Sequence, residues 1–221
     1  MGNYYDQKLN ADGLFQVYQS DIPRVLEYLN SEIEFVKEHI NKTEDIIEIG
    51  AGYGRIMKEL SPYCKSILGI DISEKNIELG NEYLKNCENT TMKQQDVHNL
   101  SIEKTFDIVL CLQNGLSAIK ADHKTIENIL NLLKPGGKAF FSSYSENFWN
   151  NRLAWFQEQA DKGLLGEIDL ENTKDGVIVC KDGFRATTYS EEDFIKIGET
   201  LGYEYEIVEV DKSSLFLIVM K

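Results

Sequence analysis

Cysteine, histidine and proline are all scarce in this chain. Its 221 residues include four cysteines, three histidines and three prolines. The cysteines lie far apart and form no CxxC pair: Cys64, Cys87, Cys111 and Cys180. That spacing disfavours a disulfide framework and a zinc site, and it favours free thiols in a reducing compartment. We therefore expect a cytoplasmic protein without a bound metal.

Basic residues are also in short supply. The 23 lysines and arginines face 37 aspartates and glutamates, which gives a formal net charge of −14. Such a charge repels the phosphate backbone of nucleic acids and the anionic surface of membranes. We expect the partner to be a small molecule rather than nucleic acid or a membrane, and the chain to act as a monomer or a homodimer.

Long hydrophobic runs are missing as well. No segment approaches the ~20 apolar residues that a membrane helix needs. The first residues, MGNYYDQKLNADG, lack the basic stretch and the apolar block of a signal peptide. The hydrophobic fraction of 42% still suffices for a soluble core. Because no internal repeat or low-complexity linker interrupts the chain, residues 1–221 are predicted to form one domain.

Strand-like and helix-like segments alternate between residues 45 and 144. Strands are expected at residues 46–50, 66–72, 90–97, 106–114 and 138–144. Helices are expected between them, at residues 53–61, 74–85 and 123–134. This alternation predicts an α/β fold with a parallel sheet that has helices on both faces. Two further strands at 203–210 and 214–221 are joined by a short turn, so they must run antiparallel.

Other segments flank this core of residues 45–144. Residues 1–44 are predicted to form a helical arm, in which Asp21 caps a helix with Pro23 in its first turn. Residues 145–189 combine an amphipathic helix with short strand-like pieces, and we expect this insert to be a lid over the substrate site. Residues 190–221 supply the last helix and the two final strands.

Three glycines follow the first strand at alternate positions. In the sequence EIGAGYGR they are Gly50, Gly52 and Gly54. A glycine turn after a strand lets the backbone approach a ligand closely. A dinucleotide site needs GxGxxG, but Arg55 stands where its third glycine should be, and no Gly-Lys-Ser/Thr follows as in a P-loop. A phosphate ligand is therefore disfavoured, and a nicotinamide-dependent oxidoreductase is the less favoured alternative.

The segment from Glu48 to Gly54 resembles the first motif of the class I S-adenosylmethionine-dependent methyltransferases, an acid followed by GxGxG. The resemblance covers roughly residues 46–144 and, more weakly, the final strands. It implies a Rossmann-like three-layer sandwich with a mostly parallel seven-stranded sheet and an antiparallel C-terminal strand. It also implies S-adenosyl-L-methionine as the cofactor and S-adenosyl-L-homocysteine as the product.

The resemblance further implies which residues bind the cofactor. These positions are Glu48, Gly50, Ala51, Gly52, Gly54, Asp71, Ile72, Asp96, Val97, Leu112 and Gln113. Glu48 would orient the methionine ammonium, together with backbone carbonyls near Leu112 and Gln113. The glycines would let the methionine part lie against the turn.

Two acids at strand ends suit the nucleoside part. Asp71 ends the second strand, where a carboxylate can accept hydrogen bonds from both ribose hydroxyls, although dinucleotide folds use an acid there too. By the resemblance, Ile72 would pack on the adenine face, Asp96 would accept from the adenine amino group, and the Val97 amide would meet a ring nitrogen. Taken alone, Asp96 could equally be a turn cap.

Methyl transfer from this cofactor needs positioning more than acid–base groups, because the sulfonium already activates the methyl. A base is needed only if the acceptor carries a proton. Neither His98 nor His123 is a strong candidate, since one follows a turn and the other begins a helix. The Asn/Asp-Pro-Pro-aromatic run of amino-group methyltransferases for DNA or glutamine is absent.

Acceptor-site candidates come from three places. By the resemblance, Asn114 at the end of the fourth strand would border the transferred methyl group. Tyr144 ends the fifth strand at the mouth of the predicted cleft, so we expect it to line the acceptor site with Asn114. Tyr18 in the arm, and Trp149 and Arg152 in the lid, are the substrate-binding candidates. We expect methyl transfer to a small molecule by in-line displacement. The acceptor and its nucleophilic atom are not defined by the sequence, and a non-catalytic S-adenosylmethionine-binding module is the main alternative.

Overall fold

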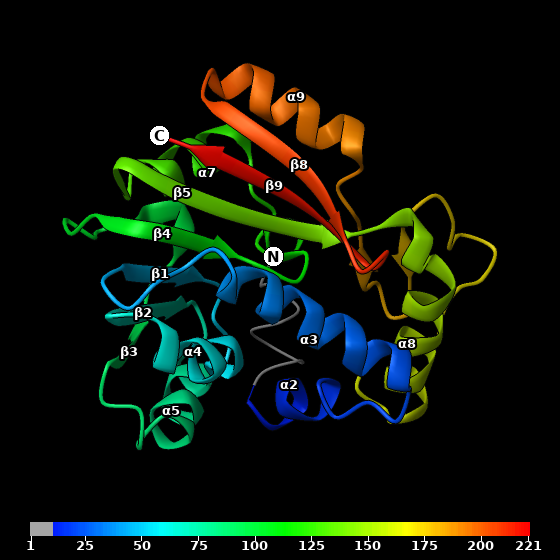
Figure 1. Cartoon of the computed structure of the whole chain (residues 1–221). Coiled ribbons are helices and arrows are strands. Elements are labelled where there is room, and N and C mark those ends of the chain that lie inside the picture. The colour runs from blue at the N-terminus through cyan, green and yellow to red at the C-terminus, as the bar shows by residue number, and fades with distance from the viewer. Residues whose placement is uncertain (1–10) are drawn as a thin grey trace.

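A seven-stranded sheet forms the centre of the molecule in the computed structural model, which describes residues 11–221. The strand order is β3-β2-β1-β4-β5-β9-β8 (Figure 1). The strands are β1 Asp45–Ile49, β2 Ser66–Asp71, β3 Thr90–Gln94, β4 Phe106–Cys111, β5 Leu133–Tyr144, β8 Glu204–Val210 and β9 Ser214–Met220. Neighbouring strands from β3 to β5 are parallel, whereas β9 pairs antiparallel with both β5 and β8. The predicted sheet is confirmed.

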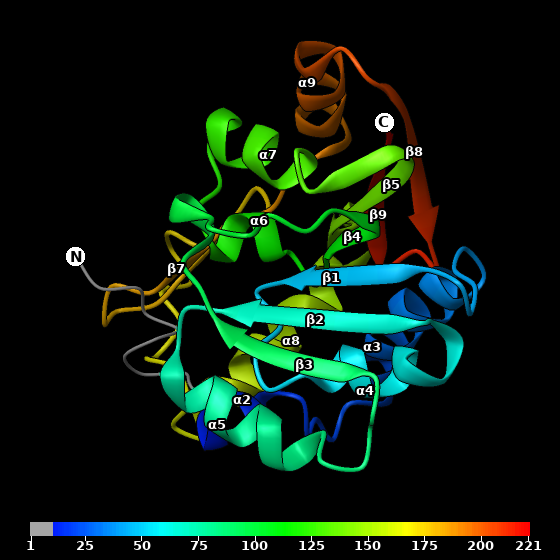
Figure 2. The same ribbon diagram turned by 90° about the vertical axis from the view of Figure 1, so that its left-hand side faces the viewer.

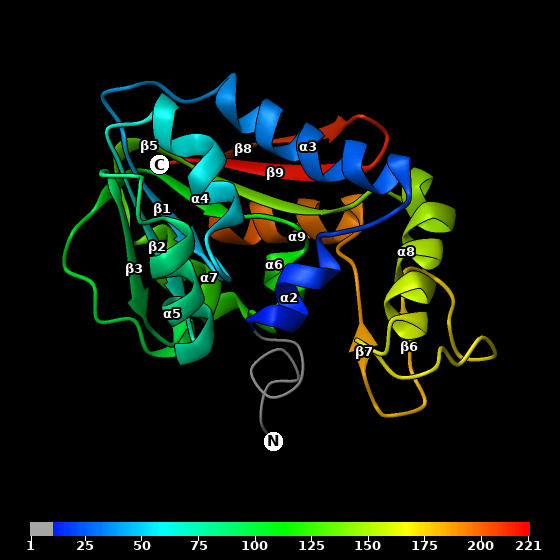
Figure 3. The ribbon, with the colours of Figure 1, turned by 90° about the horizontal axis from the view of Figure 1, so that it is seen from below.

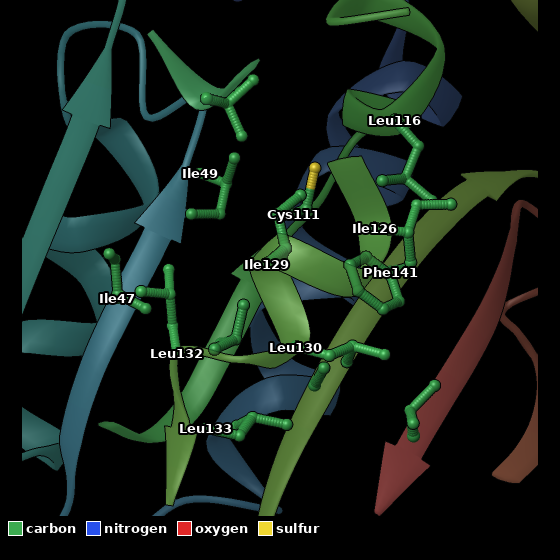
Figure 4. Close-up of a cluster of buried hydrophobic side chains, with 14 of the residues drawn as sticks. Ile47, Ile49, Cys111, Leu116, Ile126, Ile129, Leu130, Leu132, Leu133 and Phe141 are labelled. Carbon is green, nitrogen blue, oxygen red and sulfur yellow. The ribbon is translucent and has the colours of Figure 1, made fainter. Parts of the chain in front are cut away.

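Helices cover both faces of this sheet (Figure 2). The principal ones are α3 Pro23–Lys37, α4 Arg55–Leu60, α5 Glu74–Tyr83, α6 Gly115–Ala118, α7 His123–Leu130 and α9 Glu191–Leu201. One hydrophobic cluster packs α6, α7 and α9 on the sheet, and Figure 4 shows Ile47 and Ile49 of β1 facing Ile129 of α7. A second cluster packs α3 and α4 on the opposite face. All five residues of β1 are buried: three are isoleucines, and the other two are the acids Asp45 and Glu48.

The arm and the lid share a third hydrophobic cluster. The described part of the arm includes α2, Asp12–Val17. The lid contains η3 Glu146–Phe148, α8 Trp149–Asp161, β6 Ile178–Val179 and β7 Arg185–Ala186. Figures 1 and 3 place α2 between α5 and α8. The Trp155 indole N–H donates to the Val17 carbonyl at 3.1 Å, which ties the two segments together. The first ten residues of the predicted arm lie outside the described residues.

Two sequence expectations about helix ends are wrong. Asp21 does not cap α3: the N-cap is Ile22 without a side-chain cap, and the Asp21 amide instead donates to Glu158 Oε1 at 2.8 Å. The helix expected at 123–134 ends at Leu130. It ends early because Leu133 already pairs with Phe106 in the sheet, so β5 begins before the Pro-Gly-Gly turn and contains it.

Candidate functional site

A cavity lies at the carboxyl ends of the strands, where the strand order reverses between β1 and β4. Open α/β sheets bind their ligands at such a switch point. Most of the sequence-predicted residues line it: Tyr18, Glu48, Gly50, Ala51, Gly52, Asp71, Ile72, Asp96, Val97, Leu112, Gln113 and Tyr144. Four predicted residues do not appear on its wall: Gly54, Asn114, Trp149 and Arg152.

The glycine turn needs glycine for two different reasons. Gly50, Gly52 and Gly54 all have left-handed backbones, with φ of 70°, 55° and 82°. A Cβ on Gly52 would lie 2.7 Å from Leu14 Cδ2 of the arm, and a Cβ on Gly54 would lie 2.6 Å from Leu84 Cδ1. A Cβ on Gly50 would meet no atom closer than 3.8 Å, so the open side of Gly50 faces the cavity. Gly54 therefore serves packing, while Gly50 keeps room for a ligand.

Glu48 brings a carboxylate into the interior at this turn. Its side chain comes from β1 and is only 3% exposed. Burial raises the pKa of Glu48 to about 8, with Arg55 opposing the rise and Asp71 adding to it. Its Oε2 has no hydrogen-bond partner among the described residues. Because buried polar atoms are almost always paired, an unpaired acceptor on a cavity wall indicates a ligand donor.

Three unpaired donor atoms on two side chains accompany this acceptor. Arg55 begins α4 and lines the cavity, and its Nε and Nη2 are buried without a partner in the described part of the chain. Gln113 Nε2 is likewise buried and has no hydrogen-bond partner among the described residues. Sequence reasoning registered Arg55 only as a departure from GxGxxG. Its position directly after the glycine turn was the available signal that its side chain would reach the ligand.

Asp71 links the end of β2 to the glycine turn. Its Oδ2 accepts from the Gly52 amide at 2.9 Å, and its Oδ1 accepts from the Ser73 amide at 2.9 Å and from Asn76 Nδ2 at 3.1 Å. These bonds fix the orientation of the carboxylate on the cavity wall. Ile72 beside it is 41% exposed on the cavity wall, where an apolar ring could cover it.

Asp96 acts as the turn cap that the sequence also allowed. It precedes η2, Val97–Asn99, and its Oδ1 accepts from the His98 amide at 2.9 Å. It lines the cavity as well, so its capping role does not remove it from the predicted ligand site. The His98 ring also lies on the wall, with Nε2 2.9 Å from the Ile119 carbonyl and Nδ1 3.1 Å from Thr125 Oγ1. His98 thus joins η2 to the α6–α7 region.

The loop after β4 has a strained backbone. Gln113 and Asn114 both adopt positive φ, 54° and 61°, which is unusual for residues other than glycine. The Asn114 carboxamide is used inside the protein, since Nδ2 donates to the Thr187 carbonyl at 2.7 Å and Oδ1 accepts from Ser143 Oγ at 3.0 Å. The structure therefore places Asn114 behind the cavity wall, as an anchor between this loop and the lid.

Glu32 holds the same loop and was missed by sequence reasoning. This fully buried residue of α3 accepts from the Gln113 amide at 3.0 Å and from Ser214 Oγ at 2.7 Å. Burial raises the pKa of Glu32 to about 7. Hydrogen bonds from Ser214, Ser142 and Gln113 oppose this rise, because they favour the carboxylate. The available signal was an acid at a position of the apolar helix stripe, three residues after Leu29.

The arm and the lid give the rest of the cavity an aromatic and apolar wall. Its members are Val17, Tyr18, Tyr144, Trp155, Phe156, Leu165 and Phe184. Arg152 lies behind this wall, fully buried, with its guanidinium 4.4 Å from the Tyr144 ring centre. It donates to the Gly176 carbonyl at 2.8 Å. Contrary to expectation, Arg152 therefore braces the lid rather than facing the cavity.

Within residues 11–221, no cluster of three or more His, Cys, Asp or Glu side chains could hold a metal ion. None of the described helices is long and apolar enough to cross a membrane. All four cysteines are free, and Cys87 alone among them is only partly buried.

Sequence comparisons agree with this geometry. A methyltransferase-domain family model matches residues 46–137. A ubiquinone biosynthesis O-methyltransferase of Rickettsia felis is 30% identical over 135 residues, which is 61% of this chain and 54% of the relative. One from Coxiella burnetii (strain Dugway 5J108-111) is 28% identical over 128 residues, 57% of this chain and 52% of the relative. The chain spans about half the length of the curated relatives it matches.

Solved structures share the fold. The N-methyltransferase NodS of Bradyrhizobium japonicum, in complex with S-adenosylhomocysteine, matches with a TM-score of 0.62 at 16% identity and covers 100% of this chain and 99% of its own. A SAM-dependent methyltransferase of Methanosarcina mazei has a TM-score of 0.62 at 20% identity, covering 85% of this chain and 96% of its own. At these identities the likeness establishes the architecture.

Proposed function

We propose that this chain is a class I S-adenosylmethionine-dependent methyltransferase and transfers a methyl group from S-adenosyl-L-methionine to a small-molecule acceptor. One observation carries the proposal. Unpaired buried atoms of both kinds, an acceptor on Glu48 and donors on Arg55 and Gln113, meet at the cavity beside the glycine turn. An amino-acid tail with an ammonium and a carboxylate is the ligand part that pairs with such a set.

The nucleoside end of the cofactor has its own fitting residues. Asp71, already oriented by the Gly52 amide, would accept from the ribose hydroxyls. The exposed side chain of Ile72 would pack on the adenine ring. Asp96 and the Val97 amide, on the same wall, would meet the polar edge of adenine. The ends of β2 and β3 would thus supply the polar and apolar groups that bind the nucleoside part.

The methionine end would lie over the glycine turn. Glu48 and the carbonyls of Leu112 and Gln113 suit the ammonium, and the open side of Gly50 leaves space for the chain of the tail. S-adenosylmethionine, when bound, supplies a methyl group that its sulfonium has already activated. The task of the protein is to hold an acceptor in line with that methyl and to exclude water, and positioning of this kind supplies ~7–11 kcal/mol in favourable cases.

The aromatic half of the cavity defines the acceptor by shape and polarity. Rings and aliphatic side chains from the arm and the lid form most of this half. Tyr144, the last residue of β5, completes it from the sheet. Such a wall favours a small acceptor with a flat or apolar body. The relatives include an O-methyltransferase and an N-methyltransferase. The proposal therefore leaves the nucleophilic atom open and keeps Tyr18 and Tyr144 as acceptor-binding residues.

The free cysteines and the net charge support a proposal for the compartment and the partners of the protein. Free thiols are typical of a reducing compartment, so we place the protein in the cytoplasm. Its net charge of −14 favours a small-molecule acceptor over nucleic acid or an anionic membrane surface. We propose that it acts as a monomer or a homodimer.

Turnover tests the proposal. The protein is incubated with S-adenosylmethionine and a panel of small phenols, amines and carboxylic acids, and formation of S-adenosylhomocysteine is measured. We expect product with at least one acceptor, and loss of product in Asp71→Ala. Tight binding of S-adenosylhomocysteine without turnover on any acceptor would instead identify a non-catalytic binding module.

A further inference from the structure

Gln159 places a carboxamide on the aromatic wall of the cavity, the side that the arm, β5 and the lid form. It belongs to the buried face of α8, together with Arg152, Trp155 and Phe156. Only 4% of Gln159 is exposed, yet its carboxamide makes no hydrogen bond to any group in residues 11–221. Because buried polar groups are almost always paired, this carboxamide on a cavity wall indicates a polar group on the ligand.

The last turn of α8, which carries Gln159, is fixed by hydrogen bonds on two sides. The neighbouring Glu158 accepts from Ser20 Oγ at 2.6 Å and from the Asp21 amide at 2.8 Å. The Gln159 carbonyl accepts from the Leu164 amide at 2.9 Å. These bonds hold the backbone of Gln159 between the arm and the loop after α8. A ligand therefore meets a carboxamide whose helix is already in place, which lowers the cost of binding.

Charge is confined to the opposite side of the cavity. Among the described residues, the Asp, Glu, Lys and Arg side chains on its wall lie near the ends of β1, β2 and β3: Glu48, Arg55, Asp71 and Asp96. The residues that the arm, β5 and the lid contribute are all uncharged. An ionic acceptor on the aromatic side would lose its hydration without gaining an opposite charge, which is costly. This side therefore favours an uncharged acceptor.

Arg152 makes the aromatic wall unsuitable for a cation, although aromatic rings can bind cations. Its guanidinium lies 4.4 Å from the Tyr144 ring centre and 5.3 Å from that of Phe156. These two rings therefore already stabilise a positive charge inside the protein, and that charge repels a second cation. An anion gains no hydrogen bond from Arg152, which lies behind the rings and donates to the Gly176 carbonyl at 2.8 Å. It would instead meet the negative faces of the rings.

We propose that Gln159 determines acceptor specificity, and that the acceptor is an uncharged, flat molecule whose hydroxyl, carbonyl or amide group pairs with the Gln159 carboxamide. A carboxamide offers both an acceptor oxygen and a donor N–H, so it can pair with each of these neutral groups. This inference rests on the proposed function and deepens it, because it narrows the acceptor class. Acceptors whose ammonium or carboxylate would enter the aromatic side are excluded.

A matched series of ring compounds tests this assignment. The full chain, saturated with S-adenosylhomocysteine, is studied by equilibrium dialysis at neutral pH with naphthol, naphthoate, naphthylmethylammonium and methylnaphthalene, all substituted at the same ring position. We expect naphthol to bind at least about tenfold more tightly than either ion. Its advantage over methylnaphthalene should fall about 3- to 10-fold in Gln159→Met, which keeps the length of the side chain but lacks the carboxamide. Gln159→Leu should behave alike.

A control variant on the same helix separates this effect from general changes in α8. Gln157 is exposed, lies outside the cavity wall and donates to Asp161 Oδ1 at 2.8 Å, so Gln157→Met should keep the wild-type ratios. Thermal melting confirms that each variant is folded.

Three results would overturn the role of Gln159. These are an ion that binds as tightly as naphthol, an unchanged naphthol-to-methylnaphthalene ratio in both Gln159 variants, and binding of none of the four compounds. Binding of S-adenosylhomocysteine, measured first on the same sample, distinguishes these results from failure of the proposed function. If that ligand does not bind, the proposed function itself fails.

Discussion

Burial of Glu48 couples ligand binding to proton release. Its pKa is raised to about 8, so near pH 7 most unliganded molecules hold this carboxyl protonated. An ammonium bound beside it favours the carboxylate and lowers the pKa again. Binding should therefore expel a proton, and affinity should increase as the pH rises from about 6 towards the raised pKa.

Titrations in buffers of different ionisation enthalpy measure this proton. At pH 7 the wild type should show a binding enthalpy that depends on the buffer and corresponds to release of up to about one proton per site. Glu48→Gln should show less dependence and weaker binding of S-adenosylhomocysteine. Identical enthalpies for the wild type in all buffers would refute the proposed role of Glu48.

Asp71 combines ligand binding with organisation of the turn. Replacement by alanine would remove the proposed hydrogen bonds to the ribose. It would also remove the hydrogen bond that Asp71 now accepts from the Gly52 amide. Asp71→Ala should weaken S-adenosylhomocysteine binding about 10- to 100-fold, as expected for charge-assisted bonds. The variant should remain folded by circular dichroism. Unchanged affinity would rule out the ribose assignment.

Site residues that lie next to a sequence motif could be predicted from the sequence, but site residues from distant parts of the chain could not. Glu48, Gly50 and Asp71 stand at strand ends, and strand ends meet at one edge of a parallel sheet. Glu32 reaches the site from a helix 81 positions before Gln113, its partner. No local pattern predicts which loop a helix will face, so a buried acid in an apolar stripe remained uninterpreted.

At the scale of elements, α3 and β9 converge on the loop after β4 through Glu32. The bonds from the Gln113 amide and Ser214 Oγ hold two residues of positive φ in place. The pKa of Glu32 is about 7 when folded, against about 4.3 for a free glutamate. Between these values the folded state binds more protons than the unfolded state, so the free energy of unfolding falls as pH rises from about 4.5 to 7.

Denaturant unfolding isolates the contribution of Glu32. Between pH 5 and pH 8 the wild type should lose more stability than Glu32→Gln, by on the order of 1–3 kcal/mol. Glu34→Gln, on the exposed face of the same helix, should follow the wild type. Parallel pH profiles for the wild type and Glu32→Gln would contradict the titration of this buried group.

The elements of the core were easier to predict than those of the lid. A buried parallel strand such as β4 is a nearly continuous apolar run, which distinguishes it from the helices around it. In the lid, β6 and β7 are only two residues long each, and Arg152 secures their surroundings through the Gly176 carbonyl. Such tertiary contacts leave no periodic pattern, and this is why Arg152 was assigned to the substrate.

For the molecule as a whole, the strand order places the site. Reversal of the strand order between the parallel strands β1 and β4 opens a crevice. The arm and the lid cover it, and they meet where Val17 contacts Trp155, 138 positions further along the chain. Alternating strands and helices predicted the sheet. The shared cluster of arm and lid depends on packing between remote segments, so the aromatic wall could be predicted only in part, through Tyr18 and Tyr144.

The aromatic wall should control acceptor binding without affecting the cofactor. Phe184 comes from the lid, lines the cavity and stacks against Phe156 with ring centres 6.1 Å apart. Once an acceptor is known, Phe184→Ala should raise its KM several-fold through lost apolar contact, on the order of 1–2 kcal/mol. Affinity for S-adenosylhomocysteine should stay within about twofold of the wild type. A change in cofactor affinity alone would contradict this division of the cavity.

Cofactor preference tests the central claim most directly. Calorimetric titration of the purified chain with S-adenosylhomocysteine and, separately, with NADH compares the two ligand classes that a glycine turn after β1 can serve. The site geometry predicts saturable binding of S-adenosylhomocysteine and none of NADH, because Arg55 replaces the third glycine of a dinucleotide site. Binding of NADH with no affinity for S-adenosylmethionine or S-adenosylhomocysteine would contradict the account.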